Sequence, residues 1–345
     1  MHYDDYLRGG IKPDDEDNVI AALEHPDRLY RVCLAANELL LGKIIAMMQK
    51  PCPILTCLSI VADDRNVLPL VLPAGFLGRS APCLQGFRLC AVPFPALPTL
   101  LLSASNLVDL TLTDIPPTGY TSPEEMVVYL TTLPRLKTLH LRFQIVTSYS
   151  ARILPAPVER TVLPSLRELT FSGVFEYLED LVAQVDIPQL SLIYIDYFDQ
   201  GIDFEVPQLS EFFDRSENLK KILSNECKIM ICDDLLYFDV FGGATTTDKS
   251  GLWNCEDCIS FCIRCEPMDQ KISQLTNVLS WISPIISDIV HFHLQSDAFI
   301  FEPEDLEDVD WLGFLHQFSS VQTMLICGNG MDLISHCTHL KISLR

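Results

Sequence analysis

The chain has 345 residues, a length at which a folded protein buries roughly three quarters of the surface that its unfolded form exposes. Hydrophobic residues make up 48% and charged residues 20%, which excludes the low-hydrophobicity, high-charge composition of disordered proteins. With 24 Lys and Arg against 46 Asp and Glu the net charge is −22, which would repel a phosphate backbone and argues against nucleic acid as a partner.

The first residues, Met1 to Tyr6, have neither the basic nor the apolar segment of a secretory signal. The most apolar stretches, Leu68–Leu77 and Leu97–Ala104, are shorter than the roughly 20 residues that a membrane helix needs. The 13 cysteines are an odd number at irregular spacing, as expected of reduced thiols that fill small gaps in a core. We therefore expect a cytoplasmic or nuclear protein without a membrane partner.

A phrase of the form Leu-x-x-Leu-x-Leu recurs along the chain. Its first positions are separated by 29, 23, 29, 30 and 24 residues, close to the roughly 20 to 29 residues of a leucine-rich repeat. The clear copies are Leu55–Ile60, Leu84–Leu89, Leu107–Leu112, Leu136–Leu141, Leu166–Phe171 and Leu190–Ile195. Weaker copies are Leu219–Ile222, Ile289–Leu294 and Val321–Ile326.

Each phrase predicts a short strand whose leucines face a core while the residues between them face solvent. One repeat cannot bury its apolar face alone, so neighbouring repeats must stack. We predict an α/β fold, an irregular leucine-rich-repeat-like solenoid with a parallel sheet on the concave side and helices on the other. Residues 1–18 are predicted to be a flexible polar, acidic segment and residues 19–345 a single solenoid, degenerate at about 225–266 and possessing an abrupt, truncated C-terminal end.

The clearest predicted helix follows Ser122-Pro123-Glu124-Glu125 and continues to Leu133, because Ser caps, Pro suits the first turn and Glu at the third helical position completes a capping box. Further helices are predicted at about Glu176–Val185, Pro207–Asp214, Ile272–Ile282 and Glu304–Phe318. The Asn that usually follows the strand of a leucine-rich repeat is replaced, for example by Val92, Ile115 and Gln144. The turn amides must therefore find other acceptors.

Several segments resemble the large families of F-box-like, leucine-rich-repeat-like proteins of mushroom-forming fungi. The resemblance covers roughly residues 14 to 326 and rests on Asp15–Arg28, on Leu107–Leu110 through Gly119–Glu124, and on Thr161–Pro164 through Glu176–Val182. It implies a solenoid after an N-terminal F-box that docks on a Skp-type adaptor of a ubiquitin ligase while the repeats take the target. The residues before Asp14 are too few for an F-box, so we expect the F-box to be absent from this chain.

One cluster of cysteines has the residue types of a zinc site, at Cys255, Cys258, Cys262 and Cys265. Only three residues separate the two CxxC-type halves, whereas a structural zinc site has about 15 to 20. The alternative is a strand in which Ile259, Phe261 and Ile263 alternate with small cysteines. The alternation favours the strand, and we expect no metal and no cofactor.

Other motifs are weighed in the same way. Gly243–Ser250 approaches a phosphate-binding loop, but Asp248 stands where Gly is needed, so a polar hairpin loop is favoured. His291 and His293 alternate around Phe292, as on the solvent face of a strand, and a second histidine cluster lies at His336–His339. The acidic run Pro303–Asp310 fits the start of a helix better than a calcium loop.

These observations predict a non-enzymatic protein-protein interaction module, and the resemblance adds the substrate-recognition part of an F-box-type ubiquitin-ligase adaptor. The alternatives are a metal-binding protein or enzyme with its site at 255–265, and a truncated fragment without independent function. The partner is then a protein, with a Skp-type adaptor as a further candidate. The expected binding residues are the solvent-facing strand positions Arg88, Thr111, His140, Arg142, Thr170, Tyr194 and Asp196.

Overall fold

The computed structural model describes residues 16–62, 70, 72–93, 100–144, 159–197, 206–222, 226–232, 235–241, 257–264, 268–282, 286, 288–296, 317–318 and 320–328. The chain divides into two compact units, Met1–Thr170 (unit 1) and Phe171–Arg345 (unit 2), and strand β7 (Glu168–Gly173) crosses their boundary. Each unit combines helices with mostly parallel strands, so the predicted α/β class is confirmed.

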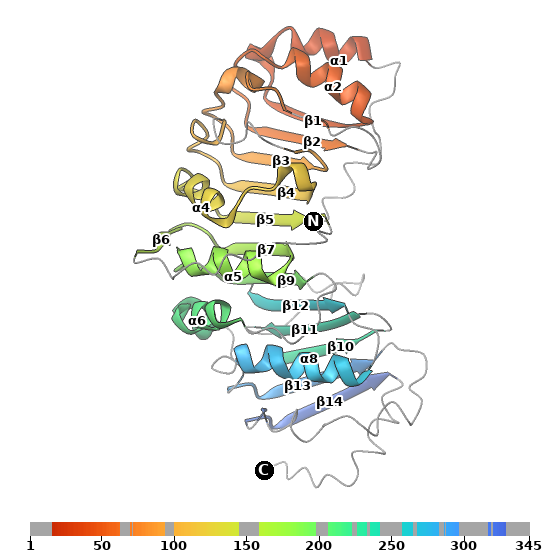
Figure 1. The fold of residues 1–345 in the computed structure, drawn as a ribbon, viewed down its shortest axis with the longest axis vertical. Helices are drawn as coiled ribbons and strands as arrows, with labels where there is room; N and C mark the ends of the chain where they lie inside the picture. The colour runs from red at the N-terminus through yellow and green to blue at the C-terminus, as the bar shows by residue number, and fades with distance from the viewer. Residues whose placement is uncertain are drawn as a thin grey trace. The chain divides into compact units, whose positions relative to one another are not determined.

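Unit 1 is built on parallel strands that pair in the order of the chain (Figure 1). They are β1 (Arg31–Ala36), β2 (Cys57–Ala62), β3 (Gly86–Cys90), β4 (Asp109–Ile115) and β5 (Thr138–Phe143). The short strand β6 (Thr161–Val162) follows. Short 3₁₀ turns stand at Pro26–Arg28, Phe76–Arg79 and Pro117–Gly119.

The leucines of the repeated phrase form the core of unit 1, as the sequence predicts. In β4, Leu110 and Leu112 are completely buried, and Leu107, two residues before the strand, is buried with them. A tight turn precedes this leucine, because the N–H of Leu107 donates to the carbonyl of Ala104 at 2.9 Å. The same turn precedes the phrases of β2, β3 and β5, and its first residue is always buried. The turn therefore places the first leucine of each phrase in the core.

Neighbouring strands of unit 1 are joined at their starts by one shared carbonyl. The carbonyl of Thr56 accepts from the N–H groups of both Gln85 and Gly86, at 2.8 and 3.0 Å. The carbonyl of Gln85 in turn accepts from Val108 and Asp109, at 2.7 and 2.9 Å. The pattern continues with Val108 as acceptor for β5 and Lys137 as acceptor for β7. These paired bonds fix the register of each strand against the one before it.

Three residues after the last leucine of the phrase, buried apolar residues occupy the position where Asn is usual. Val92 and Ile115 are each 1% exposed. The N–H of Gln144 donates to the carbonyl of Ile115 at 2.8 Å, and the N–H of Ala91 donates to the carbonyl of Thr113 at 3.0 Å. The amides at these turns thus bind the backbone of the adjacent repeat, which explains how the chain dispenses with the Asn.

Helices α2 (Glu38–Met47) and α4 (Pro123–Thr131) of unit 1 begin at side-chain caps. Helix α4 starts where the capping motif predicts, with Ser122 Oγ accepting from the N–H of Glu125 at 3.2 Å. Helix α2 is capped by Asn37, whose Oδ1 accepts from the N–H of Leu40 at 3.0 Å. Helix α1 (Glu16–Leu23) lies with α2 beyond strand β1 (Figure 1) and begins inside the segment predicted to be flexible.

Unit 2 contains parallel and antiparallel strand pairs. Its strands are β8 (Val185–Asp186), β9 (Leu192–Tyr197), β10 (Glu226–Ile231), β11 (Leu235–Phe241), β12 (Cys258–Arg264), β13 (His291–Ser296) and β14 (Thr323–Gly328). The sheet order is β9-β12-β11-β10-β13-β14, and β11 is antiparallel to both of its neighbours. The region predicted to be degenerate is therefore an antiparallel insertion between parallel strands.

One weak repeat copy is wrong. The segment Leu219–Ile222 was expected to be a strand but belongs to helix α7 (Glu217–Ile222), and strand β10 begins only at Glu226. The charges suit a helix, since Glu217 lies in its first turn and Lys220 and Lys221 lie in its last turn. The other weak copies are strands, β13 and β14.

The helices of unit 2 match the predicted ranges closely: α5 (Phe175–Gln184), α6 (Pro207–Arg215) and α8 (Met268–Trp281). Phe213 of α6 packs edge-on against Phe261 of β12, with ring centroids 6.2 Å apart, so α6 covers the apolar face of the strands. The helix predicted at Glu304–Phe318 lies almost wholly outside the described residues. In the part of the chain that the structure describes, no helix has the length and apolar character needed to cross a membrane.

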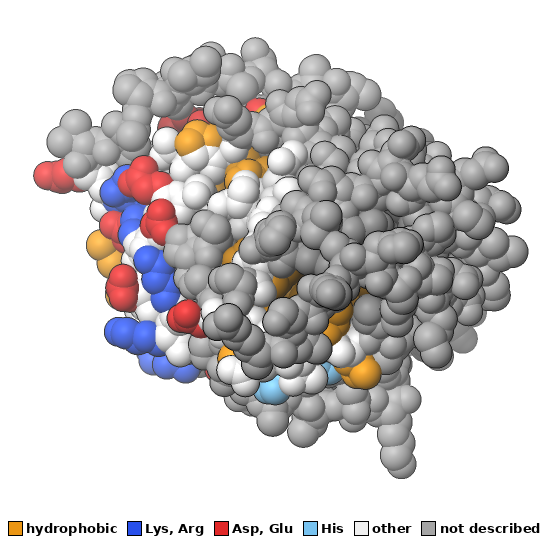
Figure 2. Space-filling model, turned by 90° about the horizontal axis from the view of Figure 1, so that it is seen from below, with side chains coloured by type: hydrophobic (Ala, Val, Ile, Leu, Met, Phe, Trp, Pro, Cys, Tyr) orange, Lys and Arg blue, Asp and Glu red, His pale blue; other side chains and the backbone are white. Residues whose placement is uncertain are grey.

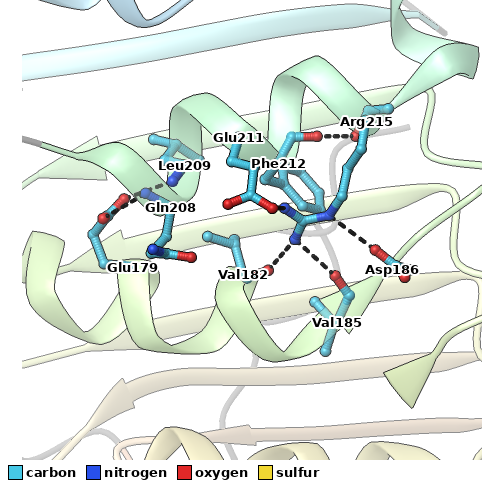
Figure 3. A network of polar contacts seen from close by, with 10 residues as sticks. Glu179, Val182, Val185, Asp186, Gln208, Leu209, Glu211, Phe212 and Arg215 are labelled. Carbon is cyan, nitrogen blue, oxygen red and sulfur yellow. Dashed lines mark hydrogen bonds and ion pairs between the residues drawn. The ribbon is translucent and has the colours of Figure 1, made fainter. Parts of the chain in front are cut away.

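Helices α5 and α6 are fastened to each other by side chains that cap each other's ends (Figure 3). Glu179 of α5 accepts from the N–H groups of Gln208 and Leu209, at 2.9 and 2.7 Å, and so caps α6, whose own N-cap residue Val206 has no side-chain acceptor. At the other end, Arg215 of α6 donates to Asp186 Oδ1 at 2.9 Å and to the carbonyl of Val185 at 3.2 Å. Backbone N–H groups at the start of α6 and a backbone carbonyl at the end of α5 thereby gain hydrogen-bond partners.

Candidate functional site

The strands of unit 1 present a polar face opposite the leucine core. Ser59, Arg88, Thr111 and His140 are register partners on β2, β3, β4 and β5, so their side chains form one row across the sheet. Each of them stands between two buried hydrophobic residues of its own strand and is half-buried itself. We call this row, together with the rows on either side of it on the same face, the unit-1 polar face.

The row toward the strand starts contains Arg31, Cys57, Gly86, Asp109 and Thr138 in register. Asp109 acts on several neighbours: it counteracts the burial that lowers the pKa of His140, and it adds to the burial that raises the pKa of Glu168. The lowered pKa keeps His140 neutral at neutral pH. The centre of the polar face therefore combines a neutral imidazole, a carboxylate and hydroxyl groups.

The row toward the strand ends is held together by a carboxylate. Asp114 Oδ2 forms an ion pair with Arg142 Nη2 at 3.2 Å and accepts from Cys90 Sγ at 3.4 Å. Burial raises the pKa of the Cys90 thiol, so the thiol stays protonated and donates. Arg142 is thus positioned by Asp114 and remains half-exposed at the surface.

Arg88 at the centre of the unit-1 polar face differs from Arg142. No hydrogen bond or ion pair joins Arg88 to another residue in the described part of the chain, although Asp109 lies one row away on the neighbouring strand. Its Nε is out of contact with solvent and has no acceptor among those residues. A buried donor without an acceptor costs about 1–3 kcal/mol, so this N–H destabilises the free protein.

Unit 2 has its own polar row, formed by the register partners Tyr194, Ser260, Asp239, Lys228 and His293. Ser260 Oγ donates to Asp239 Oδ1. Burial raises the pKa of Asp239 to about 6, against the opposing effects of Ser260 and Lys228. Lys228 and Ser260 are only 8% and 7% exposed, so this row is mostly withdrawn from solvent.

The sequence did not single out Asp239, Lys228 or Ser260. Each occupies the polar position of an alternating strand, such as Cys227-Lys228-Ile229, and that alternation was the available signal. Beside them, His293 Nε2 lies 3.4 Å from Glu226 Oε1, and His291 is exposed on the same side of β13, opposite the buried Phe292. The predicted alternation of these histidines is confirmed.

The predicted binding residues divide between the units. Arg88, Thr111 and His140 lie together in one row of unit 1, with Arg142 two residues beyond His140 on β5. Thr170 lies on β7 at the end of unit 1, between the buried Leu169 and Phe171. Tyr194 and Asp196 lie on β9 in unit 2. Burial raises the pKa of Tyr194, and Asp196 Oδ2 accepts from Ser172 Oγ at 3.0 Å.

The cysteine segment is a strand. Within β12, Ile259, Phe261 and Ile263 are buried, and Cys258 and Cys262 are buried on the opposite face. Cys255 and Cys265 lie outside the described residues, as do Gly243–Ser250, Pro303–Asp310 and His336–His339. Among the residues that the structure does describe, no three His, Cys, Asp or Glu side chains are placed to hold one metal ion.

Surface charge is mixed on the face seen in Figure 2. Among the described side chains visible there, those of Lys and Arg lie interspersed with those of Asp and Glu. Comparison with known proteins adds no assignment, because no family model matches the chain and no curated protein matches it. The candidate site therefore rests on geometry, and the unit-1 polar face offers an array of hydrogen-bonding groups whose central row contains the guanidinium of Arg88.

Proposed function

We propose that the protein is a non-enzymatic protein-protein interaction module, a leucine-rich-repeat-like solenoid that binds its partner on the unit-1 polar face. The observation that carries this proposal is the register alignment of Ser59, Arg88, Thr111 and His140 on parallel strands. Half-buried polar side chains on a rigid sheet lose little conformational freedom when they bind, which favours recognition of a protein surface.

The experiment compares two charge-matched double variants in affinity capture from native cell extract. The face variant, Thr111→Lys with His140→Glu, changes the central row. The control variant, Val128→Lys with Thr131→Glu, makes the same charge changes at exposed positions of helix α4. We expect a partner that the wild type and the control retain and the face variant loses. Equal retention by all three proteins would refute binding through this face.

The ubiquitin-ligase role implied by the family resemblance is part of the same proposal. Its readout is a Skp-type adaptor in the captured material. Recovery of that adaptor with the wild type and with the face variant alike would support separate surfaces for adaptor and target. Recovery of other partners without an adaptor would support the interaction module and refute the ubiquitin-ligase role.

A further inference from the structure

Arg88 occupies the middle of the unit-1 polar face. Its strand, β3, lies between β2 and β4, and its register partners on those strands are the hydroxyl residues Ser59 and Thr111. Both are half-buried, as is Arg88 itself. A group that reaches the guanidinium therefore also meets two hydroxyls that can donate hydrogen bonds.

Space beside the guanidinium comes from a glycine. Gly86 precedes Arg88 by two residues on the same face of β3, so strand β3 itself places no side chain next to the arginine on that side. A Cβ atom placed at Gly86 would meet only Cys57 Sγ, at an ordinary contact distance of 3.6 Å. A side chain therefore fits at this position, and its absence leaves space beside the arginine among the described residues.

The local charges make an anion the missing partner of Arg88. Asp114 is already bound to Arg142, and Asp109 forms no ion pair with Arg88 among the described residues. Arginine binds carboxylates through two parallel hydrogen bonds, and such charge-assisted bonds are roughly twice as strong as neutral ones. An acceptor from a bound partner that reaches Nε would also recover the cost of this buried N–H without an acceptor.

The net charge of the chain limits what kind of anion fits. At −22 the protein repels polyanions over long distances, so a phosphate-rich or strongly acidic partner would be slowed in its approach. A segment with one carboxylate among neutral or basic residues avoids this repulsion.

We propose that the unit-1 polar face binds an extended peptide segment of a partner protein that carries a single Asp or Glu, whose carboxylate pairs with Arg88 between the hydroxyls of Ser59 and Thr111. This inference rests on the proposed function, because it names the chemistry of the partner for the same face. Gly86 provides the space through which the carboxylate reaches the guanidinium.

The test is selection of a random dodecapeptide display library on the full-length wild-type protein, followed by affinity measurements of the selected peptides on three variants. Arg88→Gln removes the cation, and Gly86→Val fills the space without changing charge. Arg135→Gln removes one charge outside the face, at a residue whose side chain bonds only Asn106 Oδ1 among the described residues. Circular dichroism and thermal unfolding verify that each variant is folded.

We expect the selected peptides to share one Asp or Glu in a sequence that is not acidic overall. Their affinity should fall at least about tenfold on Arg88→Gln, as the loss of a charge-assisted pair predicts, fall also on Gly86→Val, and stay unchanged on Arg135→Gln. Replacing the shared Asp or Glu by Asn or Gln in the peptide should produce the same loss.

Two other outcomes would overturn the inference in distinguishable ways. In the first, the peptides lose binding to the Thr111→Lys, His140→Glu variant but lack a shared carboxylate, or bind Arg88→Gln as well as wild type. This result would support binding at the proposed face and refute the pairing of a carboxylate with Arg88. Peptides insensitive to every face variant, or a selection that yields no specific peptide, would count against both proposals.

Discussion

Glu179 of helix α5 and Gln208 of helix α6 are 29 residues apart in the sequence, yet the Glu179 carboxylate caps α6 by accepting from the N–H of Gln208 at 2.9 Å. The second carboxylate oxygen accepts from the N–H of Leu209 at 2.7 Å. Helix α6 therefore depends on its neighbour for the acceptors that most helices obtain from their own N-cap residue.

Loss of this cap should destabilise the protein. We expect Glu179→Ala to lower the free energy of unfolding by about 1–2 kcal/mol, the usual cost of removing a helix cap. Chemical denaturation at pH 5, where the raised pKa keeps Glu179 mostly protonated in the folded state, measures it. Asp214→Asn is the matched control, because it removes one negative charge from an exposed position of α6 and should change the stability by less than about 0.5 kcal/mol. Equal effects of both substitutions would contradict the capping role.

The same carboxylate should make stability depend on pH. Burial raises the pKa of Glu179 from 4.5 to about 7, and the two N–H donors only partly oppose this. The folded state therefore binds the proton more tightly than the unfolded state. Its contribution to stability is fully present below pH 4.5 and is lost as the pH rises through 7.

Measurements of thermal unfolding between pH 5 and 8 should show this loss in the wild type. Glu179→Gln cannot titrate, so the difference in stability between wild type and this variant should shift against the wild type as the pH rises. A difference that is constant over this range would show that the pKa of Glu179 is not raised. Asp239, whose pKa is raised to about 6, titrates in both proteins and cancels in the comparison.

Tyr120 links the loop after β4 to the end of β5. Its hydroxyl donates to the carbonyl of Gln144 at 2.6 Å, its ring packs edge-on against Phe143, and burial raises its pKa to about 12. Tyr120→Phe should cost about 1 kcal/mol of stability because the Gln144 carbonyl loses a donor. Tyr30→Phe provides the control, since Tyr30 is 64% exposed and the same deletion there should have no measurable effect.

The cysteines should react in two classes. Cys33 and Cys83 are exposed, whereas Cys227 and Cys262 are buried, and burial raises the pKa of the Cys227 thiol well above its usual value. N-ethylmaleimide with mass-spectrometric mapping should label Cys33 and Cys83 in the native protein and Cys227 and Cys262 only after denaturation. Early labelling of Cys227 would contradict the strand arrangement of unit 2.

The sequence predicted the core strands because their signal is local. Six residues are enough to predict both strand β4 and its buried face, from the spacing of Leu107, Leu110 and Leu112. Strand β1 carries the same signal in a weaker form, with Leu29, Val32 and Leu34 at the phrase positions.

The rest depended on information that alternation does not contain. The pattern Leu236, Phe238, Val240 predicts a strand in β11 but says nothing of its direction, so the antiparallel insertion remained hidden. The capping of α6 by Glu179, and the lack of an ion-pair partner for Arg88 among the described residues, depend on which distant segments pair with each other. In contrast, the row of Arg88, Thr111 and His140 was predictable, because equal spacing from the repeat leucines places them in register.

Successive repeats of unit 1 are joined by the same backbone contact, the shared carbonyl at the start of each strand. Thr56, Gln85, Val108 and Lys137 differ in side chain, yet each offers the next repeat the same backbone acceptor. Because side-chain identity plays no part in that joint, a whole repeat could be duplicated or removed by evolution while both new seams keep the original geometry. Substitutions in the rest of each repeat then leave the pairing of the strands intact, and the half-buried polar row can change its side chains one strand at a time.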